Sequence, residues 1–188
     1  MNEPSYKRLH KTGELQDRIA ESISSLKDCR ICPRGCGVDR TVGRAGFCRT
    51  GRYAKVASFC PHFGEESPLV GRGGSGTIFF SSCNILCTFC QNYDISHFNE
   101  GSPAGPDEIA GMMLELERRG CCNINFVTPS HVVPQILEAL PPAIEAGLSL
   151  PLVYNTGGYD RPETLRLLNG IFDIYMPDFK FWEPEYAK

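Results

Sequence analysis

The sequence lacks any long hydrophobic run. No apolar stretch approaches the roughly 20 residues that a membrane-spanning helix needs, and the amino-terminal residues MNEPSYKR have no apolar segment behind their charges, unlike a signal peptide. An excess of basic charge is also absent, since 19 Lys and Arg stand against 22 Asp and Glu. The sequence therefore predicts a cytoplasmic protein that has neither a membrane nor a nucleic acid as its partner. It contains no internal repeat.

Cysteine, in contrast, is abundant. Ten cysteines occur in 188 residues, and in a reducing compartment this density indicates metal or redox chemistry rather than disulfides. Most of them form two groups with the spacing of metal ligands. The other three are Cys60, which stands alone, and Cys121 and Cys122, which are adjacent to each other. All three are expected to be buried as small apolar side chains.

Hydrophobic patterns predict the fold class and the domains. Residues 13–27 have apolar side chains at helical spacing. From residue 77 onward, apolar runs at 77–80, 123–127, 150–155 and 171–176 alternate with helical patterns at 107–119, 132–146 and 162–168. This alternation predicts an α/β fold with parallel strands and right-handed crossovers, and Pro141-Pro142 should kink or split the second helix. The expected divisions are a helical segment (1–28), a cysteine-rich metal-binding cap (29–60) and a core (72–188).

The second cysteine group directly follows the first of these strands. Cys83, Cys87 and Cys90 have the spacing C-x3-C-x2-C, and soft thiolate ligands select iron–sulfur clusters or zinc. Three cysteines would leave one iron of a cubane cluster without a protein ligand, and an open coordination position is what a catalytic metal centre needs. The alternative is a structural zinc knuckle or three packed thiols.

The first group lies in the cap. Its spacing is C-x2-C-x3-C-x11-C, which can enclose a tetrahedral zinc ion or a second iron–sulfur cluster. The spacing does not distinguish these two metals, and a metal-free cap is a further alternative. The candidate ligands are Cys29, Cys32, Cys36 and Cys48.

The Cys83 loop, with Phe89 before its third cysteine, resembles the radical S-adenosylmethionine (SAM) superfamily. The strings GSGTIFFSSCNILCTFCQNYDIS, INFVTPSHVVPQILEAL and VYNTGGYDRPETLRLL are similar to a narrower group, the pyruvate formate-lyase activating enzyme-like proteins, as are CPRGCGVDR, PHFGEESPL and DIYMPDFKFW. The resemblance implies a partial (β/α)6 barrel and a 4Fe–4S cluster that cleaves SAM reductively and abstracts hydrogen from a substrate. It also implies a one-electron donor such as flavodoxin or ferredoxin.

The resemblance leaves the substrate open. A protein glycine in a glycyl-radical protein is the first expectation, and a small molecule or another protein is the second. A zinc-stabilised binding protein without catalysis is the rival from another class. Because four of the six implied strands occur before Lys188, we expect a barrel truncated after strand four, with weak or absent activity.

The resemblance also implies candidate SAM contacts at the carboxyl ends of three strands. They are Thr128, Ser130 and His131 after strand two, Asn155 and Thr156 after strand three, and Asp178 and Lys180 after strand four. Catalytic residues of barrel folds come from this edge. His62, Glu65 and Glu66 are expected to be polar turn residues, with ligand or acid–base roles as the alternative.

Overall fold

One mixed sheet organises residues 3–187, the part of the chain that the structure, a computed structural model, describes. Its strand order is β3-β1-β2-β4-β5-β6, so β3 and β6 are the edges. The strands are β1 (Ala54–His62), β2 (Ser75–Phe80), β3 (Ser102–Ala104), β4 (Ile124–Val127), β5 (Leu152–Thr156) and β6 (Ile174–Pro177).

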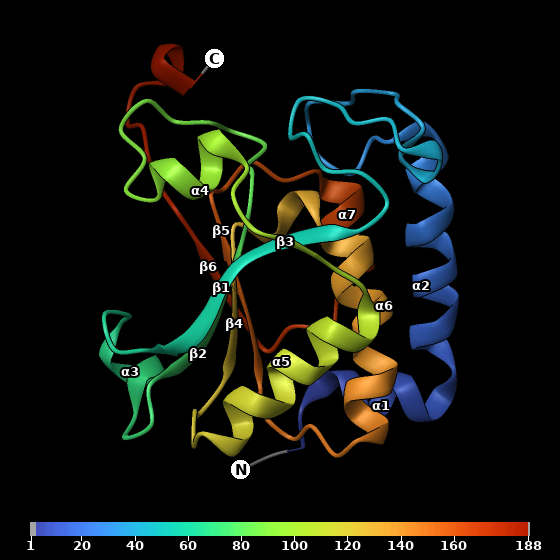
Figure 1. The fold of residues 1–188 in the computed structure, drawn as a ribbon, viewed down its shortest axis with the longest axis vertical. Helices are drawn as coiled ribbons and strands as arrows, with labels where there is room; N and C mark the ends of the chain where they lie inside the picture. The colour runs from blue at the N-terminus through green and yellow to red at the C-terminus, as the bar shows by residue number, and fades with distance from the viewer. Residues whose placement is uncertain (1–2, 188) are drawn as a thin grey trace.

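The parallel half of the sheet winds in one direction. Strands β2, β4, β5 and β6 are parallel and neighbour one another in chain order. They are joined through α5 (Pro106–Arg118), α6 (Val133–Glu145) and α7 (Pro162–Leu167), which lie on the same side of the strands in Figure 1. Right-handed crossovers without a reversal place successive helices on one face, whereas a doubly wound sheet reverses at a switch point. The predicted α/β alternation is confirmed.

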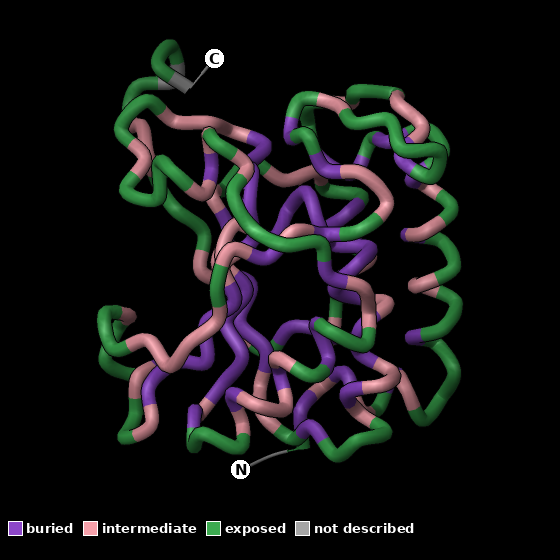
Figure 2. Tube along the Cα trace, in the orientation of Figure 1, coloured by how far each residue is buried: buried purple, intermediate pink, exposed green. Residues whose placement is uncertain are grey.

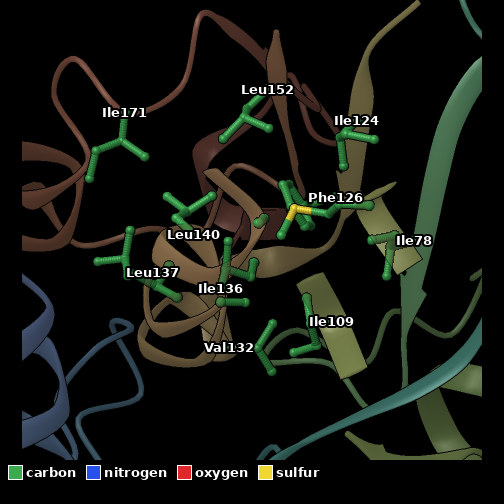
Figure 3. Close-up of a cluster of buried hydrophobic side chains, with 14 of the residues drawn as sticks. Ile78, Ile109, Ile124, Phe126, Val132, Ile136, Leu137, Leu140, Leu152 and Ile171 are labelled. Carbon is green, nitrogen blue, oxygen red and sulfur yellow. The ribbon is translucent and has the colours of Figure 1, made fainter. Parts of the chain in front are cut away.

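The core lies between this helical layer and the sheet. Ile78, Phe126 and Tyr154 point into it from β2, β4 and β5, and Figure 3 shows several of the aliphatic side chains that meet them from α5 and α6. Because side chains alternate along a strand, Thr77 and Asn125 point to the opposite face. Figure 2 shows the buried segments gathered along the strands and inner helices, with exposed loops at both ends.

Two helices precede the cap. They are α1 (Ser5–Thr12) and α2 (Glu14–Ser24), and α2 packs against α6. Gly13 joins them with a φ of 82°, a left-handed conformation that glycine adopts readily. The helix expected at 13–27 is therefore confirmed as α2 followed by a 3-10 turn, η1 (Ser25–Asp28), whereas α1 was not predicted. No helix in the described part of the chain is long and apolar enough to cross a bilayer.

The structure differs from the predicted elements in several places. Strands β1 and β3 were not predicted; β1 is antiparallel to both β2 and β3, and the predicted cap range 29–60 includes most of β1. Helix α6 continues through Pro141 and Pro142 without being split, since its buried face packs against α5 and α2. The fourth parallel strand begins at Ile174 rather than at residue 171. Further short elements are α3 (Ser67–Val70), α4 (Tyr93–Phe98), η2 (Arg40–Val42), η3 (Pro129–His131) and η4 (Pro184–Ala187).

Replacing Phe126 by Ala should destabilise the fold strongly. Its ring is fully buried and contacts Phe80 and Phe172, and a buried Phe→Ala change costs about 3–5 kcal/mol. The matched control is Phe63→Ala, because Phe63 is 64% exposed and its loss should cost about 0.5 kcal/mol or less. Urea unfolding of both variants measures the difference, and equal midpoints would contradict the core described above.

Candidate metal centre and adjoining cavity

A cavity of about 520 Å³ lies on the face of the sheet opposite α5 and α6, because its strand residues alternate with those that point into the core. Phe79, Val127 and Asn155 form part of its wall from β2, β4 and β5. These three residues pair across the parallel strands, Phe79 with Val127 and Val127 with Asn155. A volume of this size suits a small-molecule ligand.

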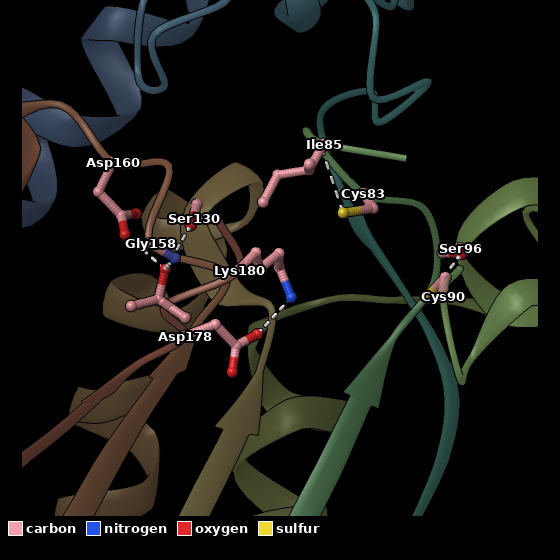
Figure 4. A network of polar contacts seen from close by, with 10 residues as sticks. Cys83, Ile85, Cys90, Ser96, Ser130, Gly158, Asp160, Asp178 and Lys180 are labelled. Carbon is pink, nitrogen blue, oxygen red and sulfur yellow. Dashed lines mark hydrogen bonds and ion pairs between the residues drawn. The ribbon is translucent and has the colours of Figure 1, made fainter. Parts of the chain in front are cut away.

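The predicted thiol triplet faces this cavity. Cys83, Cys87 and Cys90 all line it; Cys83 is buried and the other two are half-buried. The backbone N–H of Ile85 donates to Cys83 Sγ at 3.3 Å, and Ser96 Oγ donates to Cys90 Sγ at 3.4 Å (Figure 4). Burial raises the pKa of the Cys83 thiol, and hydrogen bonds from the backbone N–H groups of Leu86 and Ile85 partly offset this rise. Donors aimed at sulfur stabilise a thiolate ligand.

The loop that carries the thiols is held in an uncommon conformation. Ser82 and Leu86, on either side of Cys83, have φ values of 70° and 60°, a region that costs free energy for residues other than glycine. Ser82 is fixed there because its N–H donates to the Ile95 carbonyl at 2.9 Å and its hydroxyl donates to Asn99 Oδ1 at 2.8 Å. These two contacts hold the start of the thiol loop in this conformation.

Four of the predicted SAM contacts reach the cavity. Thr128, Asn155, Asp178 and Lys180 all line it. Lys180 Nζ lies 2.5 Å from Asp178 Oδ2, and Figure 4 shows this pair between the thiol loop and the end of β5. Burial opposes the charge of Lys180, but the hydrogen bond and charge of Asp178 outweigh it, so its pKa is raised.

The other three predicted contacts lie behind the cavity wall. Ser130 Oγ and Thr156 Oγ1 are 3.2 Å apart, and both residues are buried. His131 Nε2 lies 3.0 Å from the Ser81 carbonyl, to which it donates, and burial lowers the pKa of His131 to about 4. A neutral His131 therefore braces the start of the thiol loop instead of facing the cavity.

The turn after β5 needs glycine. Gly158 has a φ of 77°, and a Cβ there would lie 2.7 Å from the carbonyl oxygen of Asp178. Both the conformation and the close approach disfavour a side chain. Gly158 thus allows the β5 and β6 loops to approach each other beside Lys180.

The cap cysteines also converge. Cys29, Cys32, Cys36 and Cys48 line one small cavity of about 10 Å³, next to Arg40. Within residues 3–187, however, no three His, Cys, Asp or Glu side chains are arranged so that they could hold a metal ion. Neither cysteine group forms such an arrangement within these residues.

Arg40 is the unusual residue of this cap. It is 1% exposed; Nε donates to the Gly51 carbonyl and Nη1 to the His131 carbonyl, both at 3.0 Å. Nη1 also lies 3.7 Å from Cys29 Sγ, whereas Nη2 has no partner. No carboxylate of the described residues pairs with Arg40, although a buried charge is costly without a counter-charge.

The cap clamps the thiol loop through Arg34. Its Nε donates to the Asn84 carbonyl at 2.9 Å and its Nη2 to the Ile85 carbonyl at 3.3 Å. The same guanidinium lies 3.9 Å from the centre of the Phe47 ring. Arg34, which lies between Cys32 and Cys36, therefore contacts two residues between Cys83 and Cys87.

Sequence reasoning missed part of the cavity wall. His62 and Glu65 line it, although they were expected to be turn residues, and Gln91 and Asn92 complete the thiol side. The motif PHFGEE can be read in the sequence. That it lies at the end of a strand could not be predicted, because β1 itself was not. Of the remaining cysteines, Cys121 is buried as expected, whereas Cys60 and Cys122 are half-buried.

Comparison with known proteins gives a relative but no activity. No family model matches the chain. An uncharacterized protein from Methanocaldococcus jannaschii is 36% identical over 179 residues, which cover 92% of this chain and 50% of that protein. The chain thus spans half the length of the curated relative that it matches.

Replacing Arg34 by Ala should loosen the thiol loop in the metal-free protein. Losing bonds from a charged donor removes about 1.5 kcal/mol or more, so Cys83, now 8% exposed, should be alkylated about tenfold faster through local opening. Mass-spectrometric mapping of alkylation rates measures this. Arg44→Ala, at an exposed arginine of the same cap, is the control, and equal rates in the two variants would contradict the clamp.

Proposed function

We propose that this chain is part of a radical SAM enzyme of the activating-enzyme-like group. The observation that carries the proposal is the meeting of Cys83, Cys87 and Cys90 with the ends of three parallel strands around one cavity. The C-x3-C-x2-C spacing supplies the motif. The cavity supplies room for a ligand beside it.

The donor chemistry, rather than the present sulfur positions, fits a 4Fe–4S cluster with one open iron. Three thiols lie on one loop, with N–H and O–H donors aimed at two of the sulfurs, and such donors tune iron–sulfur ligands. The winding of β2, β4, β5 and β6, without a reversal and with helices on one face, supports a partial (β/α)6 barrel. Bound cluster and SAM together would supply a radical that abstracts hydrogen from the substrate.

The residues of the chain would bind, orient and shield these groups. Thr128 and Asn155 present polar atoms from strand ends, and the Lys180–Asp178 pair places one charge of each sign at the same edge. Such a pair complements a ligand that carries both an ammonium and a carboxylate. Ser130, His131 and Thr156 would act as positioning residues behind this wall.

The proposed partners follow from the same chemistry. A one-electron donor such as flavodoxin or ferredoxin would reduce the cluster, and a glycine of a glycyl-radical protein is the first candidate substrate. A small molecule or another protein remains the second candidate. The rival is a zinc-stabilised binding protein without catalysis.

We also propose that the cap binds a metal through Cys29, Cys32, Cys36 and Cys48. Arg40 supports this, because four thiolates at a metal would supply the negative charge that its buried guanidinium otherwise lacks. Either zinc or an iron–sulfur cluster satisfies this charge argument. Metal analysis distinguishes them.

Single substitutions of Cys83, Cys87 or Cys90 by Ser should abolish the oxygen-sensitive cluster. Each removes one of three protein ligands, and the cap thiols are held in a separate cavity. Anaerobic reconstitution, visible absorption, iron content and SAM binding measure the effect. Cys60→Ser is the control, since Cys60 lies in β1 and lines neither cavity.

Two outcomes would contradict this proposal. A triplet variant that keeps a full 4Fe–4S signal and binds SAM would show that the loop is not the ligand set. A colourless wild-type protein that contains only zinc after reconstitution would favour the binding-protein rival.

A double variant of Cys29 and Cys32 to Ser should lose the metal of the cap while the Cys83 loop keeps its own cluster. The two sets line different cavities, so the loss should equal one site. Metal content per chain measures it, with Cys121→Ser as a buried-thiol control. Unchanged metal content would show a metal-free cap, and loss of both sites would show that the Cys83 cluster depends on the cap.

A further inference from the structure

The cavity has a second polar region, formed by the segment after β1 rather than by the thiol loop. Strand β1 is antiparallel to β2, so its last residue, His62, pairs with Ser75 at the amino end of β2. The segment that follows turns under the cavity, where His62 and Glu65 contribute to its wall. In Figure 1 this segment, with α3, lies at the end of the sheet opposite α4. It forms the floor of the cavity.

Glu65 has the properties of a binding group rather than of a solvated turn residue. It is half-buried, and among the described residues no cation forms a salt bridge with it. Burial raises the pKa of its carboxyl, while the charge of His62 acts in the opposite direction. The neighbouring Glu66 is exposed and lines no part of this cavity.

An unsatisfied amide lies beneath Glu65. Asn125, in the middle of β4, is fully buried, and within residues 3–187 neither Oδ1 nor Nδ2 has a hydrogen-bond partner. Its side chain points away from the core, because Ile124 and Phe126 on either side of it point into the core. Its amide interacts with the Glu65 carboxyl and lowers the pKa of that group, which requires the donor atom Nδ2 to face Glu65 and leaves Oδ1 without a partner. A buried amide without partners is costly.

We infer that Glu65, supported by Asn125, is a binding site for an N–H group of the substrate, either an amine or an amide. An ionised carboxylate offers only acceptors, and Asn125, which is fully buried and does not itself line the cavity, supports this carboxylate from behind. Phe79, Val127 and the His62 ring, which meets Phe79 edge-on at 6.0 Å, give this end an apolar wall. The ligand class is therefore a nitrogen donor on a partly apolar body.

The position of the site agrees with this role. Thr128 follows β4 directly and lies three residue steps from Asn125, which corresponds to about 10 Å along the strand direction. A substrate held by its nitrogen at the floor would extend along the open face toward the thiol loop. That the bound molecule is a substrate rests on the proposed function. That Glu65 binds an N–H group does not depend on it.

Fragment binding to the metal-free protein tests the site. The probes are ethylammonium for an amine, N-methylacetamide for a peptide amide, and N,N-dimethylacetamide as the control without an N–H. Amide shifts in NMR spectra, at residues 64–66 and at the Asn125 side chain, report binding. We expect saturable shifts with at least one N–H probe and none with the control, and the probe that binds identifies the source of the nitrogen.

Substitutions then assign the site to Glu65. Glu65→Gln removes the charge but keeps the shape of the side chain. It should weaken the binding of whichever N–H probe the wild type binds, ethylammonium or N-methylacetamide, about fivefold. Glu66→Gln is the matched control and should leave the affinity unchanged. Equal affinity in Glu65→Gln and wild type, equal shifts with N,N-dimethylacetamide, or no saturable shift with any probe would overturn the inference.

A parallel measurement separates this inference from the proposed function. SAM binding to the reconstituted protein should be the same in Glu65→Gln and wild type. Loss of SAM binding in the variant would show that Glu65 holds the ammonium of SAM itself, which overturns the substrate role. Failure of the wild type to bind SAM would reject the proposed function, while the fragment results would still decide the site.

Discussion

The parallel register of β2, β4, β5 and β6 is the constraint on which the candidate site depends. It sets Phe79, Val127, Asn155 and Met176 in one row across the sheet. The thiol loop, Thr128, Gly157 and Asp178 follow this row within a few residues, so their loops meet at one edge. A slip of one residue in any strand would turn its cavity-facing side chains into the core. The alternation that buries Ile78, Phe126 and Tyr154 therefore also fixes the geometry of the site.

The sequence predicts this half of the sheet well, because burial on the helix side imposes a strong pattern. The β2, β4 and β5 runs are short and mostly apolar, α5 has apolar residues at helical spacing, and the structure confirms each element within two residues. Strand β1 (AKVASFCPH) interleaves charged and polar residues, since most of it is only half-buried, and β3 has three residues without an apolar pattern. Helix α1 buries only Tyr6 and Leu9. Such elements are fixed by pairing and docking, which a local pattern does not record.

The site residues also divide into those that a local sequence pattern predicts and those that depend on tertiary contacts. Residues at strand ends, such as Thr128, Asn155 and Asp178, are predictable because parallel strands share one carboxyl edge. Ser130 and Thr156 are equally close in sequence, but the 3-10 turn after β4 and the alternation of β5 direct them behind the wall. Glu65 was not predictable as part of the cavity, because its position depends on β1 crossing the sheet in the opposite direction to β2.

The two cysteine groups are linked by side chains that donate hydrogen bonds to main-chain carbonyls. Arg40 joins Cys29 to the His131 carbonyl, and the His131 ring in turn donates to the carbonyl of Ser81, two residues before Cys83. Arg34 contacts the same loop through the carbonyls of Asn84 and Ile85. Because thiolate charge at Cys29 would stabilise the buried guanidinium of Arg40, a metal in the cap would strengthen one end of this chain. The cap would then act on the Cys83 loop by holding its backbone in place, which is a structural role that four thiols can serve with either zinc or iron.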